Sequence, residues 1–196
     1  MQIIVHRRNT IEELKATPIK YGVEVDVRSY GEKLIVNHEP FLPAISFEEW
    51  IKCFRHKTLI LNIKEEGIEC RVKAIVEQHG IQDYFFLDLS FPALIKMVNA
   101  GEKRSAVRFS EYESLESVLV LAGKVDWVWV DCFTKVPLEK TIYNVLRGRF
   151  KLCIVSPELQ GRSLEEIKVF KEKLEHFNLD AVCTKSPDLW VNDGNG

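Results

Sequence analysis

The sequence lacks the features that mark membrane-spanning, secreted and strongly charged proteins. No apolar run approaches the roughly 18 residues that a helix needs to cross a bilayer. The first residues show no charged segment followed by a long apolar stretch, so we expect no signal peptide. The 27 Lys and Arg nearly balance the 29 Asp and Glu, which gives no argument for nucleic acid or an anionic membrane as partner. We therefore expect a cytoplasmic protein without a membrane span.

Cysteine is sparse and scattered. The five cysteines are odd in number and form no C-x-x-C pair, which argues against a disulfide framework and against a zinc knuckle. We expect reduced thiols in the core. The composition, 46% apolar and 29% charged, excludes wholesale disorder. A chain of 196 residues can bury one sizeable core, and we predict a single domain over residues 1–196.

Short apolar runs alternate with helical segments along the chain. The runs are rich in β-branched and aromatic residues and are too short for helices. They occupy Ile3–Val5, Val23–Val27, Leu59–Ile63, Tyr84–Leu89, Ser105–Phe109, Val125–Val130, Leu152–Val155 and Ala181–Cys183. Three of the helical segments open with capping boxes, at Thr10-x-x-Glu13, Ser46-x-x-Glu49 and Ser163-x-x-Glu166. This alternation is typical of parallel strands that helices bury on both faces.

Eight such β/α repeats predict a compact (β/α)8 barrel, the TIM-barrel fold. A doubly wound open sheet is the alternative, but it usually carries a glycine-rich phosphate loop after its first strand. Here the first strand ends in His6-Arg7-Arg8-Asn9. A polar turn at Gly31 separates the second strand from another β-like run, which predicts a β-hairpin after strand 2. The hairpin would return His38 to the C-terminal end of that strand.

Nearly every predicted strand ends in a polar or ionisable residue. A barrel carries its active site at these ends, and packing alone does not explain the pattern. Glu24 and Asp26 lie two residues apart on one strand, so both side chains leave on the same face. Two such carboxylates repel each other unless a proton or a cation relieves them, and a hard divalent cation suits oxygen ligands. An exposed pair without metal is the alternative.

Asn62 and Lys64 repeat this spacing on the next strand. An asparagine can lend its carbonyl oxygen to a metal, and a lysine can hold an anionic oxygen; for Asn62, capping a helix is the alternative. His6 and His38 are the two histidines predicted at strand ends, where one can act as general base and the other as general acid. Arg7 beside them suits bidentate binding of a phosphate.

These motifs resemble those of the glycerophosphodiester phosphodiesterase family. That family shows an H-R motif after the first strand, E-x-D before a hairpin, a histidine in an H-D or H-E pair, and E-x-K on the third strand. The corresponding residues here are His6-Arg7, Glu24-Val25-Asp26, His38-Glu39 and Asn62-Ile63-Lys64. The resemblance covers the first third of the chain, and sphingomyelinase-D-like and phosphatidylinositol phospholipase C enzymes are similar in layout.

The resemblance implies a (β/α)8 hydrolase that cleaves a small phosphodiester with the help of Mg²⁺ or Ca²⁺. It implies that His6 and His38 are the acid–base pair, that Arg7 and Lys64 hold phosphoryl oxygens, and that Glu24, Asp26 and Asn62 are metal ligands. The family's third ligand is a carboxylate, so the amide of Asn62 should weaken divalent binding.

The later strands supply candidate contacts to the substrate head group, with salt bridges across the barrel top as the alternative. These candidates are Asp88, Arg108, Asp131, Glu158 and Lys185. Two other functions stay open. One is a non-catalytic barrel that binds a phosphorylated sugar or polyol. The other is a metal-independent, phospholipase-C-like lyase in which Arg7 or Lys64 replaces the cation.

Overall fold

A computed structural model describes residues 1–191 of the chain. The chain divides into two compact units. The N-terminal unit comprises His6–Ala106, and the C-terminal unit comprises Met1–Val5 together with the chain from Val107 onward. That residues 1–196 form a single domain stays a prediction, and the last five residues of that range lie outside the described part.

Parallel strands alternate with helices in the N-terminal unit. Its strands pair in the order β5-β4-β2 and are β2 (Gly22–Tyr30), β4 (Leu59–Ile63) and β5 (Tyr84–Leu87). Its helices are α1 (Ile11–Ala16), α2 (Phe47–Ile51), α3 (Glu69–Gln78) and α4 (Phe91–Asn99). Within this unit the observed order follows the predicted β/α repeat.

The core of the N-terminal unit explains which residues of β2 remain for a site. Val23, Val25 and Val27 are buried in one apolar cluster with residues of the helices, among them Leu14 of α1 and Trp50 of α2. Because side chains alternate along a strand, the residues between these valines leave on the opposite face of the sheet. That face carries the polar residues described below.

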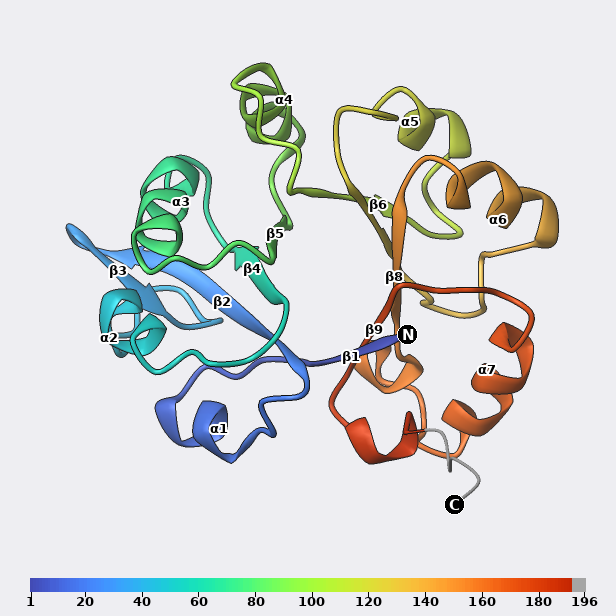
Figure 1. The fold of residues 1–196 in the computed structure, drawn as a ribbon, viewed down its shortest axis with the longest axis horizontal. Helices are drawn as coiled ribbons and strands as arrows, with labels where there is room; N and C mark the ends of the chain where they lie inside the picture. Colours follow the sequence, from blue (N-terminus) through green and yellow to red (C-terminus); the bar gives the residue numbers. More distant parts are fainter. Residues whose placement is uncertain (192–196) are drawn as a thin grey trace. The chain divides into compact units, whose positions relative to one another are not determined.

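The predicted hairpin after strand 2 is confirmed. Strand β3 (Lys33–Val36) pairs antiparallel with β2, with Val27 opposite Val36, and the pair can be followed in blue in Figure 1. Gly31 in the turn has a φ of 59°, a left-handed conformation that glycine adopts without steric cost. The antiparallel return carries the chain back along β2 toward Asp26.

The third parallel strand of this unit ends earlier than predicted. The sequence predicts a strand over Tyr84–Leu89, but β5 stops at Leu87. The next residue, Asp88, has a φ of 61°, which an extended strand cannot accommodate. This left-handed residue turns the chain out of the sheet at the strand's C-terminal end.

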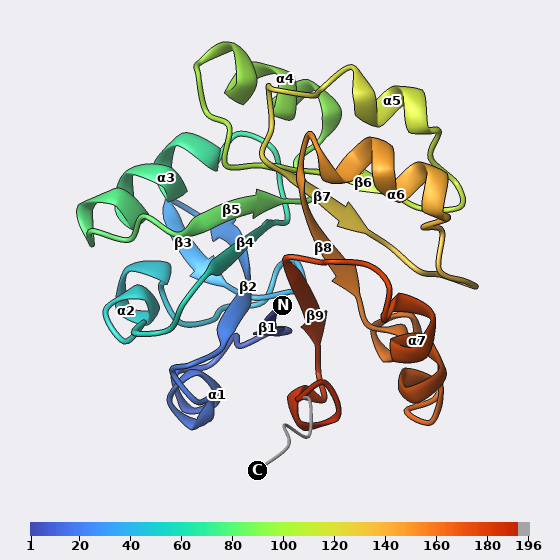
Figure 2. The ribbon, with the colours of Figure 1, turned by 45° about the vertical axis from the view of Figure 1, so that its right-hand side comes forward.

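The C-terminal unit repeats the same alternation. Its strands are ordered β1-β9-β8-β7-β6, and Figure 2 shows β7, β8 and β9 side by side. They are β1 (Gln2–Val5), β6 (Ala106–Phe109), β7 (Trp127–Val130), β8 (Lys151–Val155) and β9 (Ala181–Thr184). The helices are α5 (Leu115–Leu119), α6 (Lys140–Arg147) and α7 (Glu166–Leu174), with short 3-10 helices η1 (Pro157–Gln160) and η2 (Pro187–Leu189).

Two of the predicted capping boxes lie at helix starts, and the third is displaced. Thr10 forms a complete box with Glu13 at α1, and the Ser46 hydroxyl accepts from the backbone N–H of Glu49 at α2. Helix α7 instead begins at Glu166, three residues after the predicted cap. One of the two bonds of the predicted box is present, because the Ser163 backbone N–H donates to Glu166 Oε1 at 3.3 Å. Arg162 donates to the other oxygen, Oε2.

No helix within residues 1–191 combines the length and the apolar content that a membrane span requires. The five cysteines are outside any disulfide, and Cys132, Cys153 and Cys183 are buried. Cys70 is exposed on α3, so the expectation of core thiols is wrong for this position.

Candidate functional site

Two buried carboxyl groups lie on the inner face of β2, opposite the apolar cluster. Glu24 and Asp26 are both fully buried. The parallel pairing of β2 with β4 sets Asp26 opposite Asn62, which is also buried. Lys64 follows directly after β4, and its backbone N–H donates to the carbonyl of Val27. The regular alternation of two neighbouring strands thus gathers these polar side chains at one sheet edge.

Each oxygen of the Glu24 carboxyl accepts one hydrogen bond. The backbone N–H of Arg7 donates to Oε2 at 2.7 Å, and the Asn62 amide donates to Oε1 at 2.8 Å. His6 approaches the same carboxyl, with its Nε2 3.7 Å from Oε2. Burial, followed by the charge of Asp26, raises the pKa of Glu24 to about 7, although the two hydrogen bonds oppose the shift. Burial and the neighbouring Asp26 charge therefore favour the protonated form of Glu24 more than at an exposed carboxyl.

Asp26 is the common partner of two cationic side chains. The Lys64 Nζ lies 3.0 Å from Oδ1, and the Arg7 Nε lies 3.2 Å from Oδ2. Asn9 adds a reciprocal pair of hydrogen bonds, because its amide donates to Oδ2 at 2.8 Å and its carbonyl accepts from the Asp26 backbone at 3.0 Å. A buried carboxylate needs such compensation, and in return it fixes both cations at the strand ends.

Backbone strain is concentrated at the same place. Arg7 has a φ of 54° and Asp88 a φ of 61°, and residues other than glycine adopt this region at a cost. The Arg7 conformation accompanies the bond from its N–H to Glu24. Asp88 lies 3.6 Å from Lys64, measured from Oδ2 to Nζ. The structure thus brings Asp88, predicted as a head-group contact, to the cluster around Lys64.

The hairpin places His38 one residue beyond a backbone hydrogen bond between Asn37 and the Asp26 carbonyl, which measures 3.1 Å. The guanidinium of Arg28 donates to the carbonyls of Asn37 and His38. The His38 Nδ1 lies 2.6 Å from Glu39 Oε1. The hydrogen bond and charge of His38 lower the pKa of Glu39 most. The His38 imidazole is half-exposed, and its Nδ1 lies next to the Glu39 carboxylate.

Arg7 also contributes to lowering the pKa of Glu39. This electrostatic influence places the His38–Glu39 pair in the field of the arginine that holds Asp26. Both predicted histidines thus carry a carboxyl neighbour, Glu24 for His6 and Glu39 for His38.

Sequence reasoning missed two residues that support the cluster. Asn9 hydrogen-bonds both the side chain and the backbone N–H of Asp26. The buried Trp50 of α2 donates from its indole nitrogen to the carbonyl of Arg8 at 2.8 Å, and the Arg8 N–H donates to the Glu24 carbonyl. The position of Asn9 beside His6-Arg7 was a usable signal, whereas nothing around Trp50 in the sequence indicates its partner.

The donor set matches a hard divalent cation in kind. Glu24 and Asp26 offer carboxyl oxygens, and the Asn62 Oδ1 is buried without a hydrogen-bond partner in the described part of the chain. An oxygen left in this state suits a cation as its partner. Residues 1–191 contain no group of three or more His, Cys, Asp or Glu arranged for a metal, so the amide would have to complete the set.

The other predicted head-group contacts belong to the C-terminal unit, where the side chains of Arg108, Asp131 and Glu158 bond to residues of the same unit. Arg108 forms an ion pair with the buried Asp131, and the Gln160 amide donates to the second Asp131 oxygen at 2.7 Å. The salt-bridge alternative therefore describes the geometry of Arg108 and Asp131 as it stands.

Glu158 joins the ends of β8 and β9. Its carboxylate accepts from the hydroxyls of Ser156 and Thr184 and from the backbone N–H of Lys185. Trp190 donates to the Ser156 hydroxyl at 2.8 Å. Lys185 itself is exposed. Glu158 thus acts as a tie between two strand ends, with three donors on one carboxylate.

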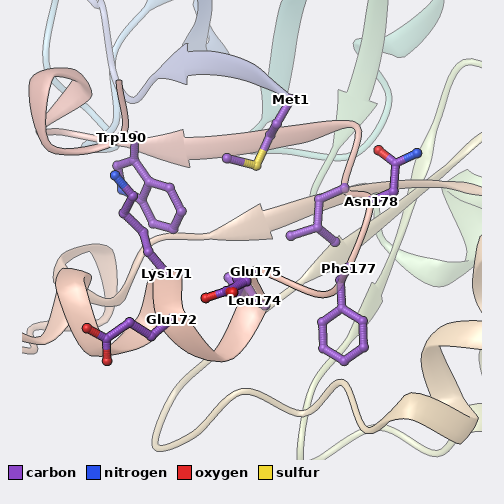
Figure 3. Close-up of a pocket in the computed structure, with 9 residues that line it drawn as sticks. Met1, Lys171, Glu172, Leu174, Glu175, Phe177, Asn178 and Trp190 are labelled. Atoms are coloured by element: carbon purple, nitrogen blue, oxygen red, sulfur yellow. The ribbon is translucent and has the colours of Figure 1, made fainter. Parts of the chain in front are cut away.

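A pocket of about 530 Å³ lies in the C-terminal unit, beside α7 (Figure 3). It is lined by Met1, Lys171, Glu172, Leu174, Glu175, Phe177, Asn178, Leu179 and Trp190. None of the predicted site residues is among them. The pocket therefore shares no lining residue with the polar cluster.

No protein-family model matches the sequence, and no curated protein matches it. Solved structures similar in fold include two glycerophosphodiester phosphodiesterases. A glycerophosphodiester phosphodiesterase from Agrobacterium tumefaciens is 14% identical, with a TM-score of 0.69, and the match covers 96% of this chain and 98% of that one. A glycerophosphodiester phosphodiesterase from Thermotoga maritima is 19% identical, with a TM-score of 0.67 and 96% of each chain covered.

At these identities the likeness establishes the fold. The chain has the (β/α)8 fold of these two enzymes, as its alternating parallel strands and helices predict. The resemblance inferred from four short motifs in the first third of the sequence therefore extends, in fold, over nearly the whole chain.

Proposed function

We propose that this protein is a divergent glycerophosphodiester-phosphodiesterase-like hydrolase that cleaves a small phosphodiester by acid–base catalysis. The observation that carries the proposal is the cluster at the strand ends, where Asp26 holds both Arg7 and Lys64 and His6 lies beside Glu24. Cations fixed on a buried carboxylate, next to an imidazole, match what the cleavage of an anionic ester requires. The shared fold supports the same reaction class.

Arg7 and Lys64 are the proposed ligands of the phosphoryl oxygens. Their guanidinium and ammonium groups would stabilise negative charge that grows on those oxygens in the transition state. Asp26 holds both groups before substrate arrives, so little reorganisation is needed when the substrate binds. Asp88, which lies 3.6 Å from Lys64, limits where that ammonium can move.

His6 and His38 are the proposed acid–base pair. One imidazole takes the proton from the attacking oxygen as the new oxygen–phosphorus bond forms. The other gives a proton to the leaving oxygen as the old bond breaks, so the pair ends with its proton count unchanged. Glu24 and Glu39 stabilise the protonated imidazoles and orient the rings. The attacking oxygen belongs to water or to a neighbouring hydroxyl of the substrate.

A divalent cation, Mg²⁺ or Ca²⁺, is the proposed cofactor, with Glu24, Asp26 and Asn62 as its ligands. When bound, such a cation adds positive charge at the phosphoryl oxygens. The buried Asn62 oxygen without a hydrogen bond supports this assignment, and the amide explains why the affinity should be modest.

A metal-independent reaction is the second candidate, and one observation favours it. Lys64 and Arg7 both lie within 3.2 Å of Asp26, so this carboxylate already has two positive partners. In that case the two side chains alone supply the positive charge. A neighbouring hydroxyl of the substrate attacks the phosphorus, and the bond to the leaving oxygen breaks.

Hydrolysis of bis(p-nitrophenyl) phosphate and of a panel of glycerophosphodiesters tests the proposal. The assay is run with Mg²⁺, with Ca²⁺ and with a chelator, on the wild type and on His6→Ala, His38→Ala and the control His176→Ala. His176 is an exposed histidine of the C-terminal unit. We expect turnover that both site variants lose and the control retains. Turnover insensitive to the chelator would select the metal-independent reaction, and equal rates in all variants would refute the proposed function.

A further inference from the structure

An exposed aromatic side chain lies in the loop that carries His38. Phe41 is 91% exposed, and its backbone φ is 63°. Single exposed apolar residues are common on protein surfaces, but a bulky residue in the left-handed region is a true outlier. Phe41 therefore has both an exposed apolar side chain and an unfavourable backbone conformation. The other non-glycine residues with positive φ within residues 1–191 are Arg7 and Asp88, which belong to the candidate site.

The loop is built to hold this conformation. Its base is closed because the Val36 N–H donates to the Ile45 carbonyl at 3.0 Å. Inside it, the Asn37 side chain accepts from the Glu39 backbone at 3.2 Å and donates to the Leu42 carbonyl at 3.4 Å. These bonds tie residues 37–42 into a turn that presents Phe41. An unconstrained loop would relax away from a strained backbone, so the strain here is maintained by specific contacts.

The turn sets Phe41 close to the proposed chemistry. Phe41 follows His38 by three residues, so their Cα atoms lie at most roughly 11 Å apart, even in a fully extended chain. His38 is held at the strand end by Arg28, which donates to the His38 carbonyl. The next residue, Leu42, is also exposed, at 54%. An exposed apolar pair thus lies within four residues of His38, in the same loop.

We propose that Phe41, with Leu42, is a specificity-determining element that packs against an apolar group of the substrate. The substrate class is then an amphiphilic phosphodiester, with a charged phosphate for Arg7 and Lys64 and an alkyl or acyl group for Phe41. This inference rests on the proposed function and names the substrate class of that site. Removing apolar surface from water gives such a contact its affinity.

A matched pair of substrates tests the proposal. Glycerophosphocholine and its hexanoyl ester share the phosphodiester and the head group and differ by one six-carbon acyl chain. The ester is used as a monomer, below the concentration at which it forms micelles. The measured quantity is the ratio of kcat/KM for the ester to kcat/KM for the parent, in the wild type, in Phe41→Ala and in Ile19→Ala. Ile19 is an exposed apolar residue of the N-terminal unit, at 67%, and lies just before β2.

We expect the ratio to exceed one in the wild type and in Ile19→Ala, and to fall about tenfold or more in Phe41→Ala. A ratio that stays within twofold in Phe41→Ala would overturn the inference. An equal fall in Ile19→Ala would overturn it too, because the effect would then belong to exposed apolar surface in general.

A binding measurement keeps this test independent of turnover. The four tryptophans of the chain, Trp50, Trp127, Trp129 and Trp190, are all buried, so Phe41→Trp adds the exposed indole. We expect its emission to shift to the blue with the hexanoyl ester and not with glycerophosphocholine. If the wild type hydrolyses neither these two compounds nor the substrates of the first assay, the proposed function fails, and the emission alone decides the inference.

The same variant separates a soluble substrate from a lipid surface. Phosphatidylcholine vesicles are added in place of the monomeric ester. A blue shift with vesicles and none with the ester would overturn the proposal in favour of a membrane surface. A saturable shift with the monomeric ester supports it.

Discussion

The Asn62 amide donates a 2.8 Å hydrogen bond to Glu24 across the neighbouring strands β4 and β2, and its own oxygen stays buried without a hydrogen bond within residues 1–191. The amide therefore does two things. It stabilises a buried carboxyl as a donor, and it offers an oxygen to the same polar cluster. A carboxylate at position 62 would keep the second role and lose the first.

Asn62→Asp should make stability depend on divalent cations. With a chelator present, the new carboxylate faces Glu24 without the amide donor, and we expect a loss of about 1–3 kcal/mol in the free energy of unfolding. Added Ca²⁺ or Mg²⁺ should restore much of this loss, because a third carboxylate strengthens the ligand set. Urea denaturation under both conditions measures the effect. Equal stability with chelator and with cation would contradict the assignment of Asn62 as a ligand.

Trp50→Phe should impair both stability and turnover. The variant keeps the ring in the apolar cluster and removes the hydrogen bond to the Arg8 carbonyl. We expect a loss of about 1 kcal/mol in stability and a lower kcat, because the Arg8 backbone positions His6 and Arg7.

Trp190→Phe is the matched control, since it also loses one indole hydrogen bond, to Ser156. It should lower stability without lowering kcat. A fall in kcat of similar size in both variants would mean that Trp50 acts through stability alone.

Glu158→Gln separates a structural tie from a head-group contact. The amide loses the charge that three donors share, and we expect a loss of about 1–3 kcal/mol in stability. KM should stay within twofold. The opposite result, a raised KM at unchanged stability, would show that Glu158 contacts substrate. Thermal denaturation and steady-state kinetics on one preparation give both quantities.

Glu102 should make the N-terminal unit sensitive to acid. Burial alone would raise the pKa of Glu102, but hydrogen bonds from Arg104 and Lys73 outweigh it and lower the pKa to about 2. A folded-state pKa below the ordinary 4.5 means that the stabilisation is complete above pH 4.5 and is lost as pH falls from 4.5 toward 2.

We expect up to about 2–3 kcal/mol of stability to disappear over that range, and Glu102→Gln should flatten this part of the profile. Urea denaturation at half-unit steps of pH measures it. A wild type and variant with parallel profiles between pH 2 and 4.5 would contradict the prediction.

The inner face of β2 could be predicted because it depends on a local rule. Valines at 23, 25 and 27 alternate with Glu24 and Asp26, so burial of one set leaves the other on the opposite face. The hairpin was predictable for a similar reason, since Gly31 marks a turn between two β-like runs. Local periodicity and turn chemistry act within a few residues, where the sequence can be read directly.

The supporting contacts could not be predicted in this way. Trp50 bonds to Arg8, which is 42 positions away in the sequence. The left-handed backbone that ends β5 occurs at Asp88, where no glycine indicates such a conformation. The bonds around Glu158 likewise join residues up to 27 positions apart. Such relationships depend on how distant segments pack, which neither propensity nor spacing records.

The hairpin of β2 and β3 fixes the position of His38, and the exposed turn after it can change independently of that position. Its register is fixed by the pairs from Val27–Val36 to Tyr30–Lys33, and Arg28 fixes the backbone at His38. Glu39 contacts the His38 imidazole, and residues 40–44 are exposed beyond this pair. Exchanging this short segment should therefore alter substrate range without disturbing the core or the histidine. The same division gives a natural route to new specificities, through insertion or replacement in one surface turn.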